Sequence, residues 1–180
     1  MIKHIELNIS IEATDQLYSI IRGGKYEWTE LQENIEKFYE YDNIEVVFAV
    51  TVMNTNIMQL DKIWDWFDMY HKNKASISMS NVVVNPSYLN IAYLPQELKH
   101  IALDKIARIP NQAIWPAGSY HEKEHEYGTG IESIKNGLLN VPDFDEQQKY
   151  WKYFLQYTKD LDRLRKTNTF AEVKEFKYYE

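Results

Sequence analysis

Polar and hydrophobic residues alternate strictly near the start of the chain, from His4 to Glu12, which predicts a β-strand with one aliphatic and one polar face. Residues 44–53 are almost all aliphatic, a pattern typical of a strand buried on both faces of a parallel sheet. Residues 75–84 alternate again, with serines opposite hydrophobic side chains. The sequence therefore predicts three strands.

Hydrophobic residues recur at helical spacing between these strands, over residues 28–39 and 57–70. Thr29 and Gln32 have the spacing of a capping box, which predicts that the first of these helices begins there. Strands that alternate with helices, joined by crossovers of more than a dozen residues, indicate right-handed βαβ units. The predicted fold class is α/β, with three parallel strands.

Helical patterns dominate the rest of the chain. Ile101 is expected on the inner side of a helix that follows Leu94–Pro95, and residues 143–165 predict a long helix. No linker rich in Gly, Pro or Ser divides the chain. We therefore expect a βα domain over residues 1–109 and a helical C-terminal extension over residues 110–180 that packs on the same domain.

The charge of the chain argues against nucleic-acid and membrane partners. Its 20 basic residues are scattered among 27 acidic ones, for a net charge of −7, whereas phosphate binding needs clustered lysines and arginines. The longest apolar stretch is far below the roughly 20 residues of a membrane span, and the first residues lack the apolar core of a signal peptide. We expect a cytoplasmic protein.

The chain contains no cysteine. This excludes disulfides, thiol nucleophiles, thiolate zinc sites and iron–sulfur clusters held by cysteines. Any chemistry must come from other side chains.

Polar side chains follow each predicted strand. In parallel α/β sheets, ligands bind at the carboxyl ends of the strands, where loops and helix N-termini converge. Such an edge could hold a polar zwitterionic molecule, with an arginine for its carboxylate, although polar residues also end many strands simply because they cap turns. The candidate side chains are Ser10, Glu12, Thr51, Asn54 and Asn85, with Arg22 shortly after the first strand.

His121 to His125 matches the H-E-x-x-H pattern of zinc hydrolases, in which two histidines one helical turn apart bind the metal. Such a helix is normally flanked by apolar residues, whereas this segment is almost wholly charged and lies between two glycines. A third zinc ligand would have to be a residue such as Glu132 or Glu146. The distance in sequence from the histidines supports neither of them. A solvated surface turn is the favoured interpretation, and a metal hydrolase is the weaker alternative.

Three short motifs occur in order along the first part of the chain, at Ile9–Glu12, Ile21–Gly24 and Asn34–Ile35. They form a strand that ends in Ser-x-Glu, then an Arg-Gly turn, then a helix with an Asn-Ile pair. This order resembles the middle of a radical S-adenosylmethionine (SAM) barrel. The resemblance implies the C-terminal half of a TIM-type barrel.

Later segments extend this resemblance over most of residues 4–176. Val50–Asn54 is similar to the next barrel strand and its polar end. Tyr88–Lys99 resembles the segment after the last strand in members with a twitch domain, and Leu161–Arg165 resembles their C-terminal Asp-x-x-Arg helix.

The resemblance implies a role for each candidate side chain. Ser10 and Glu12 would face SAM, Arg22 would bind its carboxylate, and Thr51 or Asn54 would lie near its ribose or methionyl part. Asn85 would open onto the same pocket mouth. The Cys-x3-Cys-x2-Cys loop of the family is missing, so this chain cannot bind the [4Fe-4S] cluster and is not expected to be catalytic alone.

An incomplete barrel leaves sheet edges exposed, and exposed edges recruit partners. We therefore expect a homodimer or a complex with a complementary N-terminal half-barrel chain. The alternative is a non-catalytic α/β interaction or oligomerisation module that keeps the scaffold without the ligand.

Overall fold

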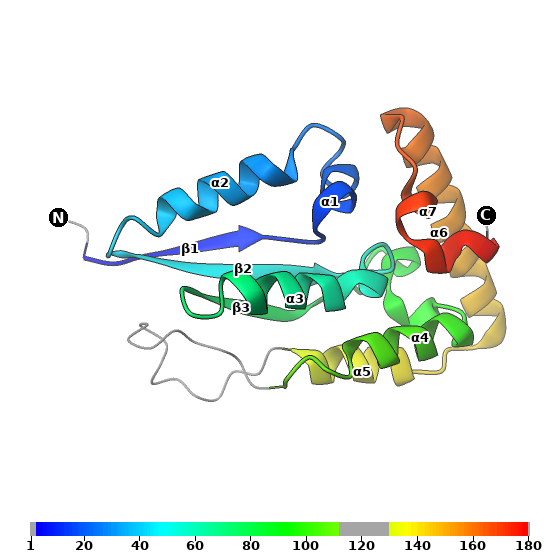
Figure 1. The fold of residues 1–180 in the computed structure, drawn as a ribbon. Coiled ribbons are helices and arrows are strands. Elements are labelled where there is room, and N and C mark those ends of the chain that lie inside the picture. The colour runs from blue at the N-terminus through cyan, green and yellow to red at the C-terminus, as the bar shows by residue number, and fades with distance from the viewer. Residues whose placement is uncertain (1–2, 112–129, 180) are drawn as a thin grey trace.

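The computed structural model describes residues 3–111 and 130–179 (Figure 1). Its centre is an open, three-stranded sheet in the order β1-β2-β3, in which both neighbouring pairs of strands are parallel. The strands are β1 (Ile5–Ser10), β2 (Ile44–Val52) and β3 (Ala75–Val82). The prediction of an α/β fold with three parallel strands is confirmed.

Helices connect the strands and continue after the sheet. Those between the strands are α1 (Asp15–Ile21), α2 (Trp28–Phe38), the short 3-10 helix η1 (Ile57–Gln59) and α3 (Leu60–Tyr70). After β3 come η2 (Ser87–Leu89), η3 (Ile91–Tyr93), α4 (Gln96–Ile106), α5 (Ile131–Leu139), α6 (Phe144–Arg165), α7 (Thr169–Glu172) and η5 (Lys174–Tyr179).

The main core lies between one face of the sheet and the helices α2 and α3. Phe48 of β2 is fully buried, and its ring centroid lies 5.0 Å from that of Trp66 in α3. Trp66 in turn contacts Trp28 of α2 edge to face, with centroids 5.1 Å apart. Edge-to-face aromatic pairs contribute about 0.5–1.5 kcal/mol beyond the area that they bury. These contacts hold both helices on the same face.

The opposite face of the sheet is polar. Glu6, Asn8 and Ser10 of β1 alternate with the core-facing residues and are exposed. On β3, the hydroxyls of Ser78 and Ser80 lie 2.9 Å apart, beside a break in the β2–β3 register. Faces of parallel sheets are usually buried and aliphatic, so this face is unusual for its composition.

The C-terminal helices pack at the carboxyl end of the sheet, toward which β1 and β2 point in Figure 1. Phe154 of α6 and Phe176 of η5 are fully buried, and their rings meet edge to face at 5.6 Å. The long helix predicted over residues 143–165 is confirmed. Its N-cap is Asp143, whose carboxylate accepts hydrogen bonds from the backbone N–H groups of Asp145 and Glu146.

Two local predictions are wrong. The helix α2 begins at Trp28 without a side-chain cap, so Thr29 and Gln32 form no capping box. It is also preceded by α1, which is the first helix after β1. In α4, Ile101 is 38% exposed whereas Lys99 is buried. The Lys99 ammonium donates a hydrogen bond of 2.6 Å to the carbonyl of Asn140 at the end of α5.

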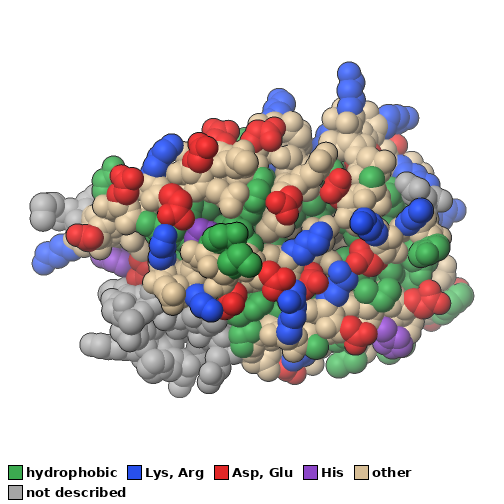
Figure 2. All heavy atoms as spheres, viewed as in Figure 1, with side chains coloured by type: hydrophobic (Ala, Val, Ile, Leu, Met, Phe, Trp, Pro, Cys, Tyr) green, Lys and Arg blue, Asp and Glu red, His purple; other side chains and the backbone are tan. Residues whose placement is uncertain are grey.

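The surface visible in Figure 2 mixes acidic and basic side chains, without a continuous basic patch on that face. Among the residues that the structure describes, no helix has both the length and the apolar character needed to cross a membrane.

Candidate functional site at the carboxyl edge of the sheet

Three of the predicted site residues come together just beyond β1. Arg22 follows the last turn of α1 and reaches back to the strand end, where its Nη2 donates a 2.7 Å hydrogen bond to the carbonyl of Ser10. The same Nη2 lies 2.8 Å from Oε2 of Glu12. The Ser-x-Glu strand end and the Arg-Gly turn are therefore in direct contact.

The ion pair between Arg22 and Glu12 is only partly satisfied. The Glu12 side chain is 10% exposed, whereas that of Arg22 is 34% exposed. Oε2 of Glu12 and Nε of Arg22 are buried and have no well-aligned hydrogen-bond partner among the described residues. Burial raises the pKa of Glu12, and the nearby Arg22 charge opposes this rise without cancelling it. Both atoms are shielded from solvent, so the ion pair rests mainly on the single contact through Nη2 of Arg22.

The end of β2 lies next to this pair and is tied to it by Asn56, which is fully buried. The Asn56 amide donates hydrogen bonds of 2.8 Å to the carbonyls of both Glu12 and Thr51, and its oxygen accepts one from the N–H of Met53. The Thr51 hydroxyl accepts a 3.1 Å hydrogen bond from the Asn81 amide on β3. Asn56 thus fixes the relative position of two strand ends.

The other two predicted residues lie elsewhere. Asn54 is fully buried and turns toward η2, where its amide donates a 2.9 Å hydrogen bond to the carbonyl of Tyr88. Its oxygen has no partner among the described residues. Asn85 is exposed and precedes the cis peptide bond to Pro86. The structure thus groups Ser10, Glu12 and Arg22 beside Thr51, and it does not bring Asn54 and Asn85 into that group.

A cavity of about 270 Å³ also opens at this edge, and none of the six predicted residues lines it. Its walls are the last turn of α1, the loop after β2, η2 and the C-terminal half of α6. The sequence could not show this cavity directly, because its walls come from segments more than 100 residues apart. One segment that lines this cavity, Leu161–Arg165, stands out in the sequence because it resembles an Asp-x-x-Arg helix.

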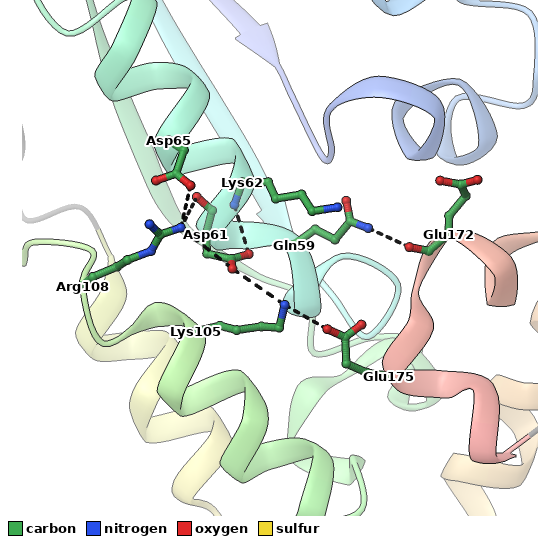
Figure 3. Close-up of polar contacts among 8 residues, drawn as sticks. All are labelled: Gln59, Asp61, Lys62, Asp65, Lys105, Arg108, Glu172 and Glu175. Carbon is green, nitrogen blue, oxygen red and sulfur yellow. Dashed lines mark hydrogen bonds and ion pairs between the residues drawn. The ribbon is translucent and has the colours of Figure 1, made fainter.

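A network of charges attaches the C-terminal segment to the helices beside the sheet (Figure 3). The Lys105 ammonium of α4 lies 2.9 Å from the Glu175 carboxylate of η5 and 3.7 Å from that of Asp61 in α3. Arg108 lies 2.6 Å from the Asp65 carboxylate. These contacts are partly exposed, so each contributes little alone. Together they help to position the C-terminal segment that follows α6.

Metal ligation finds no support in the described part of the chain, where no group of three or more His, Asp or Glu side chains could hold an ion. The H-E-x-x-H segment from His121 to His125 lies outside the described residues. The fold and the site together define an α/β protein with a polar carboxyl edge. Comparisons with protein-family models, curated proteins and solved structures find no match for the chain.

Proposed function

We propose that this chain is the C-terminal half of a radical SAM-type barrel, with a rim that binds SAM or a related zwitterionic molecule and with no cluster chemistry of its own. The single observation that carries the proposal is the Ser10–Glu12–Arg22 contact at the carboxyl end of β1. It combines a cation and a carboxylate at the edge where parallel sheets bind ligands.

The polar face of the sheet also supports this proposal. Glu6, Asn8 and Ser10 are exposed on it, and such a row suits an interior filled by water or ligand better than a hydrophobic core. In a barrel, the face opposite the helices is the interior. The helices α2 and α3 cover the other face, as a half barrel would require.

The proposed roles follow from the donors and acceptors of each group. The Arg22 guanidinium would bind the ligand carboxylate through donors that Ser10 and Glu12 leave free, since Nη2 already serves both. The Glu12 carboxylate would accept from an ammonium or hydroxyl group. Thr51 lies beside them and would contact the next part of the ligand, with Asn54 and Asn85 farther along the edge.

Isothermal titration of the chain with SAM tests the proposal. Wild type should give saturable heat, and both Arg22→Ala and Glu12→Ala should abolish it. Arg108→Ala is the matched control, because Arg108 also pairs with a carboxylate but lies just after α4, outside the rim. No saturable heat from wild type, or equal loss in the Arg108→Ala variant, would refute the proposed ligand.

The exposed edge of the sheet supports the partner proposed for such a half barrel. Among the described strands, β1 pairs with β2 alone, and its first residue, Ile5, is 36% exposed. An open strand edge pairs readily with another chain. We propose a homodimer or a complex with an N-terminal half barrel. A light-scattering mass equal to one chain excludes the homodimer.

A second candidate function is a non-catalytic α/β interaction module. The observation in its favour is that Arg22 is already paired with Glu12, so the rim can be stable without a ligand. Oligomerisation without any SAM heat is the result expected for this module.

A further inference from the structure

The cavity at the carboxyl edge lies apart from the Arg22–Glu12 pair and has the character of a binding site. Ile20 and Ile21 of α1, Met53 after β2, and Leu161 of α6 give it apolar walls. Its volume of about 270 Å³ lies just below the range of about 300–1,000 Å³ for drug-sized ligand pockets, so it suits a smaller molecule. Pockets of this kind bind an apolar body and use a few polar groups to orient it.

Arg165 is the one cation on the cavity wall. Its Nη1 donates to the carbonyls of Ile20 and Ile21, at 3.2 and 3.3 Å, so the guanidinium is anchored at the end of α1. No described residue accepts a hydrogen bond from its other nitrogens. Arg165 is therefore held in place with free donors.

The other arginines are different. Arg22, Arg108 and Arg163 lie 2.8, 2.6 and 3.1 Å from a carboxylate, whereas Arg165 forms no ion pair with any described residue. Its charge faces two carbonyl dipoles and the cavity mouth. An arginine that lacks an acidic partner beside an apolar cavity is suited to an anionic ligand.

Asp162 also borders the cavity, but its carboxylate has a structural role. It accepts hydrogen bonds from the hydroxyls of Thr167 and Thr169, at 2.7 and 2.9 Å, and from the backbone N–H of Thr169, at 2.9 Å. These three donors fix the start of α7 and occupy the carboxylate as an acceptor. Arg165 is thus the charged group on the cavity wall that keeps hydrogen-bond donors for a ligand.

We propose that this cavity binds a small organic carboxylate with an apolar, aromatic or branched body. The body lies among Ile20, Met53 and Leu161, and the carboxylate accepts hydrogen bonds from the free donors of Arg165. This site is separate from the proposed SAM rim, and its existence does not depend on that function.

An NMR titration of the full chain with 2-naphthoate tests this site. We expect saturable shifts in the backbone amides of Ile21, Met53, Thr55 and Leu161. The neutral analogue 2-naphthamide should bind wild type at least about tenfold more weakly, because it lacks the charge-assisted hydrogen bonds. This comparison needs no variant, so it holds even where a substitution prevents folding.

Three variants complete the test. Arg165→Gln should weaken 2-naphthoate binding at least about tenfold and remove the preference over the amide. Thr55→Phe should fill the cavity and block binding. Arg163→Gln is the control, because Arg163 is on the same helix but pairs with Asp160, and it should bind like wild type. Absence of saturable shifts, shifts elsewhere, or equal affinity for acid and amide would overturn the proposal.

Discussion

His71 should make the stability of this protein depend on pH. It follows the last residue of α3, is 3% exposed, and packs against Trp66 with ring centroids 4.2 Å apart. Its Nδ1 lies 2.8 Å from the hydroxyl of Tyr39, which can donate to it while the ring is neutral. Burial lowers the pKa of His71 to about 4, and the nearby charges of Glu36 and Lys74 act in opposite directions.

The sign and size follow from this shift. Between pH 6.5 and 4 the unfolded chain binds a proton at His71 and the folded chain does not, so stability falls as the pH falls through this window. The loss should reach about 2 kcal/mol at pH 5 and about 3 kcal/mol at pH 4, since one pKa unit corresponds to ~1.4 kcal/mol. Above pH 7 the effect disappears.

Urea unfolding of wild type and His71→Asn at pH 7 and pH 5 measures this contribution. An asparagine amide can take the place of Nδ1 but does not titrate, so the variant should lose about 2 kcal/mol less than wild type between these pH values. The packing lost in the variant cancels in this difference. His100→Asn is the control, because that ring is exposed on α4, and it should follow wild type. Parallel stability curves for wild type and His71→Asn would refute the reasoning.

Two further predictions concern the backbone around the site. Gly130 has φ +89° and an added Cβ would lie 2.4 Å from the backbone of Ser80, whereas Gly23 has φ +88° and an added Cβ would lie 3.9 Å from the Arg165 guanidinium. An added Cβ at Gly23 makes only ordinary contacts, so in thermal unfolding Gly130→Ala should cost at least about 3 kcal/mol and Gly23→Ala only about 1 kcal/mol, and equal losses would contradict this contrast. Asn56→Ala should cost about 3 kcal/mol in urea unfolding, because two buried carbonyls lose their donor. Asn56→Asp should cost more, since its carboxylate would face both carbonyl oxygens, and a smaller loss than for alanine would show that these hydrogen bonds are unimportant.

The sheet could be predicted from sequence because its signals are local. Alternation along β1 and the aliphatic run of β2 each fit within one strand, and the helical spacing between them specified parallel crossovers. α1 was missed because it has only seven residues and no side-chain cap. The capping box at Thr29 failed because the N-cap of α2 is Glu27, two residues earlier, and the helix begins at Trp28, whose ring is buried against Trp66.

The site could be predicted only in part, for the same reason. Ser10, Glu12 and Arg22 are close in sequence, so a strand end and the following turn were enough to group them. The contacts of Asn56 with Glu12 and of Arg165 with Ile20 join residues 44 and 145 positions apart. The burial of Lys99 likewise depends on Asn140, which is 41 residues away. Contacts between residues so far apart in the sequence cannot be predicted from a local sequence pattern.

The link between Arg165 and the end of α1 has a consequence for biosynthesis. The carbonyls of Ile20 and Ile21 leave the ribosome long before Arg165, which donates hydrogen bonds to them. Until Arg165 has been synthesised, the carbonyls at the end of α1 lack these hydrogen bonds. The apolar side chains of α1 that line the cavity are then exposed to solvent. This region can therefore be completed only after α6 has been synthesised.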